Sequence, residues 1–202
     1  QCLGGGTAQA GRAQAQAQKF GAHLAISRAA SALFCDSHPY RIELEDGRSV
    51  RAKSIVVATG ARYRKLDLPN YDRFEGQGIY YAATGLEAQL CESQPVALVG
   101  GGNSAGQAAM FLSRTAAHIH ILVRGPDLSA GMSDYLVQRI GHSPRITVHP
   151  FTEVTVLDGD RFLRSVTWTD RSNGKRETHP IGSLFVMIGA VPSGCSALYS
   201  GG

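Results

Sequence analysis

The stretch that decides the fold runs from residue 95 to residue 106 and reads PVALVGGGNSAG. Its first five residues form an apolar run typical of a strand that is buried on both faces of a sheet. The run leads directly into a glycine-rich turn, and residues 107–114 beyond the turn have helical composition. Strand, glycine turn and helix in this order are the beginning of a dinucleotide-binding βαβ unit.

The small residues of this turn have separate expected tasks. Gly100 permits the tight turn, Gly102 leaves room for a pyrophosphate, and Ala105 lets the helix pack closely on the strand. The free N–H groups and the positive dipole of the helix start would bind the pyrophosphate, with Asn103 or Ser104 adding a side-chain donor.

A further strand is predicted over residues 118–123, and Arg124 follows it. A site that prefers NAD usually has an acidic residue at this point, whereas a guanidinium suits the 2′-phosphate of NADPH. The sequence therefore favours NADPH, although Arg124 could also be an ordinary solvated loop residue.

The remaining pattern predicts an α/β protein with a Rossmann-like parallel sheet and an antiparallel β-meander. Aspartate-glycine or asparagine-glycine pairs mark the expected hairpin turns near residues 46, 158 and 173. We expect helices over residues 1–20, 107–114 and 132–140, the last capped by Ser133; buried strands over 54–60, 95–99, 118–123, 145–149 and 183–189; a meander over 24–52; and hairpin strands around 154, 162–169 and 176–179.

Composition excludes several classes of protein. With 43% hydrophobic and 18% charged residues, the 202-residue chain should be globular. The net charge of +4 comes from scattered residues, which argues against a nucleic-acid partner. No apolar run is long enough for a membrane span, and no signal region opens the chain. The cysteines show neither metal-ligand nor CxxC spacing, so we expect no metal and a cytoplasmic location: Cys2, Cys35, Cys91, Cys195.

Three short motifs follow one another along the chain, and their order carries a resemblance to a known family: ATG at 58–60, GGGNSA at 100–105 and FxxIGxxP at 185–192. Over residues 12–192 the chain resembles the bacterial low-molecular-weight thioredoxin reductases, the class II pyridine nucleotide-disulfide oxidoreductases. The resemblance implies a partial flavin-domain remnant and linker over residues 1–84, an NADPH-binding domain over 85–190, and an irregular tail over 191–202.

The chain departs from that family in its redox and flavin segments. Where the family has its CATC dithiol, the sequence reads AATG at residues 82–85, so thiolate exchange has no nucleophile there. The family's basic pair for the 2′-phosphate is reduced to Arg124. FAD is expected for the family, but no GxGxxG precedes Gln1 and no closing Gly-Asp segment follows Gly194, so we expect an incomplete FAD site.

These observations predict an NADPH-binding, oxidoreductase-derived fragment without the redox dithiol. Apolar surface around residues 55–57 should be exposed in such a fragment, and we expect a homodimer through it.

Two other functions remain open. Residues 102–106 also satisfy GxSxG, so a serine ester hydrolase would use Ser104 as nucleophile, His149 as base and Asp127 as the orienting acid, with His142 and His179 in reserve. Against it, Ser104 is explained as a helix-start residue and Asp127 as a turn former, and no HGGG-like loop lies upstream. The ligand would be a small-molecule nucleotide or ester; a non-catalytic interaction module would bind neither.

Overall fold

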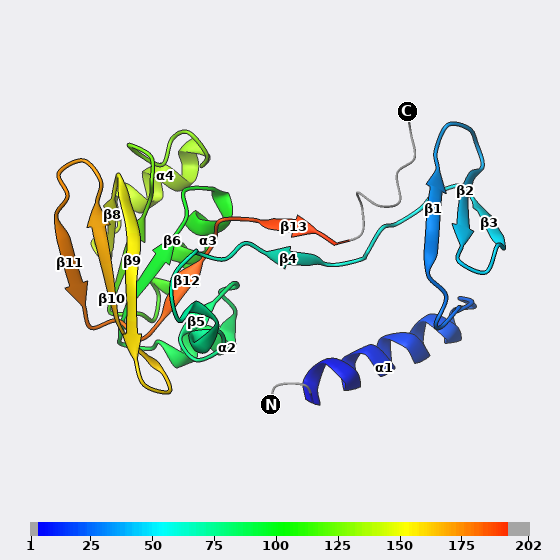
Figure 1. The fold of residues 1–202 in the computed structure, drawn as a ribbon, viewed down its shortest axis with the longest axis horizontal. Helices are drawn as coiled ribbons and strands as arrows, with labels where there is room; N and C mark the ends of the chain where they lie inside the picture. The colour runs from blue at the N-terminus through cyan, green and yellow to red at the C-terminus, as the bar shows by residue number, and fades with distance from the viewer. Residues whose placement is uncertain (1–3, 194–202) are drawn as a thin grey trace. The chain divides into compact units, whose positions relative to one another are not determined.

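The structure, a computed structural model, describes residues 4–193 of the chain (Figure 1). The chain divides into two compact units, one of residues 1–60 and 192–202 and the other of residues 61–191. The nucleotide domain expected over residues 85–190 lies within the second unit. That unit also contains residues 61–84, which the sequence analysis assigned to the flavin-domain remnant.

The first unit contains the predicted helix and meander. Helix α1 (Gly4–Lys19) is followed by an antiparallel sheet of β1 (Ala30–Phe34), β2 (Tyr40–Leu44) and β3 (Ser49–Ala52). The turn between β2 and β3 forms at Asp46 and Gly47, as predicted, and Gly47 has a φ of +81°. The carboxylate of Asp46 accepts hydrogen bonds from Arg28 and Arg48, which close this turn.

The strand predicted over residues 54–60 is wrong. These residues form no strand, and the side chain of Val56 is 90% exposed. A buried strand requires hydrogen-bonding neighbours on adjacent strands. In the described part of the chain, residues 54–60 have such a neighbour only in Ser193. Its N–H donates to the Gly60 carbonyl at 2.9 Å, and its carbonyl accepts from the Thr59 hydroxyl. Apolar composition alone therefore misled the prediction.

The second unit is built on a parallel sheet in the order β5-β12-β6-β7-β8. The predicted buried strands at residues 95–99, 118–123 and 145–149 are confirmed within one residue at each end. The five strands are β5 (Ile79–Tyr80), β6 (Pro95–Val99), β7 (His118–Leu122), β8 (Ile146–His149) and β12 (Leu184–Val186).

Each face of this sheet has its own cover. Val96 and Leu98 of β6 pack in one core with α2 (Gly85–Leu90), α3 (Asn103–Leu112) and α4 (Asp134–Gly141). The alternate residues of the same strand, Ala97 and Val99, pack in a second core with the 3₁₀ helix η1 and the hairpin strands. The second cover comprises η1 (Tyr71–Phe74), β9 (Thr152–Gly159), β10 (Leu163–Asp170) and β11 (Arg176–His179).

The strand predicted over residues 183–189 is shorter than expected. β12 ends at Val186, and Gly189 has a φ of +89°, which turns the chain into β13 (Ala190–Pro192). β13 pairs with β4 (Ala61–Tyr63), so the first two residues of the predicted irregular tail lie in a strand. Residues 194–202 lie outside the described residues. Over residues 4–193, no helix has the length and apolarity that a membrane crossing requires.

Candidate functional site

The glycine turn after β6 has a backbone that only glycine fits. Gly100 has a φ of +143°, and its N–H donates to the Leu122 carbonyl at 3.1 Å. A Cβ at this position would lie 2.4 Å from the carbonyl oxygen of Met187. The turn therefore passes directly against the end of β12, and a side chain at residue 100 would force the two segments apart.

Helix α3 begins immediately after this turn and has no side-chain cap. Gly102 is its N-cap residue, and the first helical hydrogen bond runs from the Gly106 N–H to the Gly102 carbonyl at 3.1 Å. The first-turn N–H groups of a helix have no intrahelical acceptor, and they carry the positive end of the helix dipole. This helix start therefore offers donors to an anion.

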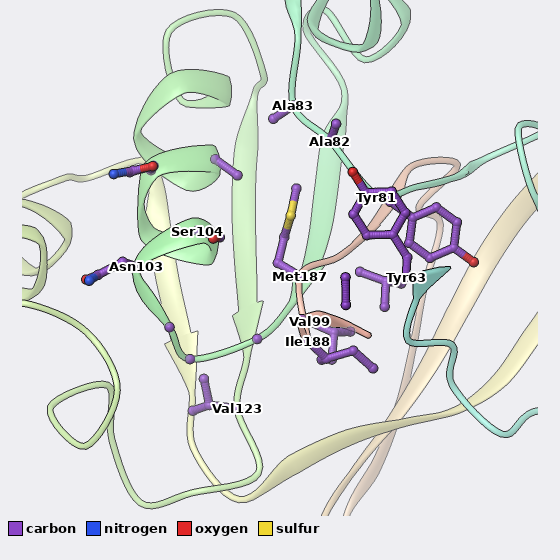
Figure 2. Close-up of a pocket in the computed structure, with 18 of the residues that line it drawn as sticks. Tyr63, Tyr81, Ala82, Ala83, Val99, Asn103, Ser104, Val123, Met187 and Ile188 are labelled. Carbon is purple, nitrogen blue, oxygen red and sulfur yellow. The ribbon is translucent and has the colours of Figure 1, made fainter. Parts of the chain in front are cut away.

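These donors border a pocket of about 930 Å³ at the carboxyl ends of β6, β7 and β12 (Figure 2). Ligands of open α/β sheets bind outside this edge. Arg124 is exposed and is the only charged side chain that lines the pocket in the described part of the chain. The glycine-turn end of the pocket is therefore suited to a phosphorylated ligand.

The structure places the six predicted cofactor residues around this turn in different ways. Ser104 and Asn103 lie exposed in the first turn of α3, whereas Ala105 of the same turn is fully buried in the core beside β6. The side-chain oxygen of Asn103 accepts a hydrogen bond from the Ser133 N–H at 2.8 Å, so only its NH₂ group remains for a ligand. Ser133 is the N-cap of α4, as predicted, but its own side chain makes no capping bond.

The three residues of the hydrolase interpretation do not assemble into a triad. Ser104 lines the large pocket, but His149 lines a different pocket of about 270 Å³ and has its Nε2 3.0 Å from Nδ1 of His120. The carboxylate of Asp127 accepts from the N–H and hydroxyl of Ser129, at 2.8 and 2.6 Å. Each proposed partner of Ser104 is thus engaged elsewhere.

The reserve histidines are also engaged. Nδ1 of His142 lies 2.7 Å from the Gln138 carbonyl, and His179 stacks on Trp168 with ring centroids 3.9 Å apart.

Histidines gather instead on the hairpin side of the sheet. The ring of His120 lies within 5.5 Å, centroid to centroid, of His149, His179 and Trp168. Burial, and then the neighbouring His149, lower the pKa of His120 from 6.5 to about 4, and burial also lowers the pKa of His149. Within residues 4–193, no three or more His, Cys, Asp and Glu side chains are arranged to hold a metal ion.

Sequence reasoning missed an aromatic wall at the other end of the large pocket. The rings of Tyr63 and Tyr81 stack with centroids 5.0 Å apart and planes 7° apart, across the pocket from Asn103 and Ser104 (Figure 2). The hydroxyl of Tyr81 donates to the carboxylate of Glu75. Burial and this carboxylate raise the pKa of Tyr81, so the ring carries a neutral hydroxyl. Two tyrosines 18 residues apart, both outside any predicted strand, give no motif that could have indicated the pair.

The fold and the site together define a Rossmann-type α/β protein with a glycine turn at the dinucleotide position. The sequence matches the pyridine nucleotide-disulphide oxidoreductase family over residues 5–199, and the chain belongs to that family.

Relatives from other organisms are similar to most of this chain. A thioredoxin reductase of Streptomyces coelicolor is 33% identical over 179 residues, covering 89% of this chain and 54% of the relative. An NADH dehydrogenase of Bacillus subtilis is 31% identical over 154 residues, covering 76% of this chain and 30% of the relative. The chain thus spans about half, or less, of the length of these proteins.

Solved structures confirm the fold. The thioredoxin reductase from Giardia duodenalis superposes with a TM-score of 0.78 at 24% identity, over 97% of this chain and 62% of that chain. The thioredoxin reductase of T. acidophilum gives a TM-score of 0.69 at 22% identity, over 95% of this chain and 61% of that chain. The predicted class, a Rossmann-like parallel sheet with antiparallel elements, is confirmed.

Proposed function

We propose that the second unit binds NADPH and acts as the nucleotide domain of an oxidoreductase that does not use a dithiol. The observation that carries this proposal is the uncapped start of α3, which follows the Gly100 turn and opens into the pocket at the carboxyl edge of the sheet. Membership of a pyridine nucleotide-dependent family supports it.

The residues present fit a dinucleotide. Gly102 has a φ of −96°, and a Cβ added there would meet only the Gly131 carbonyl at 3.7 Å, so the protein leaves the space at the helix start open. The N–H groups of the first turn would hold the pyrophosphate, and Arg124 would bind the 2′-phosphate. When bound, NADPH supplies a hydride; the pocket walls would orient its reactive end and limit the access of water.

Among the residues that the structure describes, no thiol lines this pocket to replace the family's dithiol. By the sequence resemblance, Ala82 and Gly85 stand at the two cysteine positions of the family's CATC; Ala82 lines the pocket, and Gly85 begins α2. Cys91 is fully buried, its Sγ donates to the Glu87 carbonyl at 3.2 Å, and burial raises the pKa of its thiol. A buried thiol with a raised pKa is a poor nucleophile. We therefore infer that electrons leave the nucleotide by a route that needs no cysteine of this pocket.

The described residues do not fit an FAD site of their own. Residues 4–60 contain no strand that leads through a glycine turn into a helix, and they line neither of the two pockets described above. The apolar segment at residues 55–57, which the family resemblance places in the flavin domain, is largely solvent-exposed. We infer that this chain alone holds FAD weakly or not at all.

The test is a calorimetric titration of the full chain with NADPH and with NADH. We expect saturable binding that favours NADPH, and Arg124→Gln should weaken NADPH binding about tenfold while leaving NADH binding within twofold, because only NADPH carries the 2′-phosphate. Arg114→Gln, an exposed arginine near the C-terminus of α3 outside the large pocket, is the matched control.

Absence of nucleotide binding would refute the proposal, as would equal effects of Arg124→Gln on the two nucleotides. Hydrolysis of p-nitrophenyl esters that disappears in Ser104→Ala would favour the esterase instead.

A further inference from the structure

The large pocket has two chemically different ends. At the glycine turn lie the uncapped helix start and Arg124, which suit phosphate. At the opposite end lie the stacked rings of Tyr63 and Tyr81, with Met187 and Ile188 beside them, and no charged side chain of the described residues lines this end. A ligand that fills the pocket therefore needs an uncharged, apolar portion at the aromatic end.

The aromatic wall is held in place from behind. The Tyr81 hydroxyl donates to Glu75, and the other carboxylate oxygen of Glu75 accepts from Nζ of Lys65 at 2.7 Å. Lys65 also bonds Asp72 at 2.9 Å. The hydroxyl of Tyr81 is thus directed away to a carboxylate that lines none of the pockets described, which leaves the ring as the part of this side chain available for packing. A ring fixed in this way loses little conformational freedom when a ligand packs on it.

Small side chains border the fixed ring. Ala82 and Ala83 follow Tyr81 directly and also line the pocket. Each side chain ends at Cβ, as the short sticks in Figure 2 show, so neither alanine fills the space beside the tyrosines with a larger group. A fixed aromatic face beside these two methyl groups is suited to a flat conjugated ring, because such rings stack offset or edge to face at centroid distances of about 4.5–7 Å.

We propose that Tyr81, supported by Tyr63, forms a binding subsite for an uncharged, planar, conjugated ring at this end of the pocket. The inference rests on the proposed function for the neighbouring phosphate end, but not for the aromatic end itself. The ring is either the nicotinamide of the bound nucleotide or the ring of a quinone-like substrate, and the two have the same stacking chemistry.

Three probes distinguish these sources in a calorimetric titration: NADPH, 2′-phospho-ADP-ribose, which lacks the nicotinamide, and duroquinone, whose fully substituted ring does not add to thiols. Tyr81→Ala should weaken NADPH or duroquinone about tenfold and leave 2′-phospho-ADP-ribose within twofold. If Tyr81→Ala loses affinity for NADPH alone, the ring bound at this end is the nicotinamide. If the variant loses affinity for duroquinone, the ring bound there belongs to a substrate. Tyr81→Phe keeps the ring and should retain most of the affinity.

The control is Tyr135→Ala, which removes a tyrosine that is 65% exposed on α4 and does not line this pocket. If Tyr81→Ala fails to fold by circular dichroism, Tyr63→Ala replaces it with the same expectation, because that ring is 52% exposed. The inference would be overturned if the variant bound NADPH and duroquinone with unchanged affinity. It would also be overturned if the affinity for 2′-phospho-ADP-ribose fell as much as the affinity for the ring-bearing probes. A wild-type chain that binds duroquinone through Tyr81 but no nucleotide would sustain it and refute only the proposed function.

Discussion

Two glycines of one turn should respond in opposite ways to the same added methyl group. At Gly102 an alanine keeps an ordinary φ of −96°, and its Cβ would meet the Gly131 carbonyl at 3.7 Å, a normal contact. Stability should therefore change by less than about 1 kcal/mol. The methyl group would stand where the pyrophosphate must approach the helix start, so loss of one charge-assisted hydrogen bond of about 2 kcal/mol should weaken NADPH binding about thirtyfold.

At Gly100 the cost falls on folding. An alanine there must adopt a φ of +143° with its Cβ 2.4 Å from the Met187 oxygen, and backbone strain together with overpacking amounts to about 3 kcal/mol. For a unit of this size, the midpoint of thermal unfolding should fall by about 10 °C.

Thermal unfolding followed by circular dichroism, with NADPH calorimetry on each variant, measures both effects. Gly141→Ala, at the end of α4 with nothing within 4 Å of its added Cβ, is the control and should change neither quantity. Wild-type affinity in Gly102→Ala would refute the placement of the pyrophosphate. Wild-type stability in Gly100→Ala would refute the geometry of the turn.

Three further predictions concern other parts of the molecule. The pKa of His120 is about 4 in the folded chain against an ordinary 6.5, so the unfolded chain takes up the proton first as the pH falls. The contribution of this ring to stability is full above pH 6.5 and should fall by about 3 kcal/mol as the pH drops to 4, measured by urea unfolding. A stability that rises over this interval would contradict the burial of the ring. Trp168 is 2% exposed, and Trp168→Ala should destabilise the chain by about 3–5 kcal/mol in the same assay, whereas a loss below 1 kcal/mol would show that the hairpin is not packed on the sheet. We also propose that the exposed apolar residues 55–57 mediate a homodimer. Light scattering should show a dimer for the wild type and a monomer for Val56→Asp. A monodisperse wild-type monomer would argue against the proposal.

The strands and hairpins that sequence predicted correctly carry their information locally. In β7, Ile119 and Ile121 alternate with His118 and His120, and a period of two places one pair in the helix-side core and the other pair toward the hairpins. The turn at Asn173 and Gly174 needs a positive φ, which Gly174 supplies at +74°. These features depend on near neighbours in the chain, and a pattern of a few residues is enough to identify them.

Features that depend on distant residues could not be predicted. The run at residues 54–60 has the composition of a buried strand but lacks partner strands, and composition does not report partners. His149 was placed at the correct sheet edge, yet it pairs in register with Leu122, whose side chain faces the hairpin core, so its ring lies on that face and away from Ser104. The tyrosine wall requires β4, residue 81 and Glu75 to meet, which only the folded chain reveals.

The contact between the two glycine segments has a consequence for how such sequences can change in evolution. A Cβ at Gly131 would lie 3.2 Å from the Gly101 carbonyl oxygen, and the neighbouring Asn103 side chain is tied to Ser133. Positions 101 and 131 therefore share one small space although 30 residues separate them. Among natural relatives we expect a larger residue at position 131 to appear only with a compensating displacement of the 124–133 loop. That loop starts at Arg124, the residue that we propose selects the nucleotide. A substitution that displaces the loop would therefore also move Arg124. Among relatives, residue size at position 131 and preference for NADPH or NADH should change together.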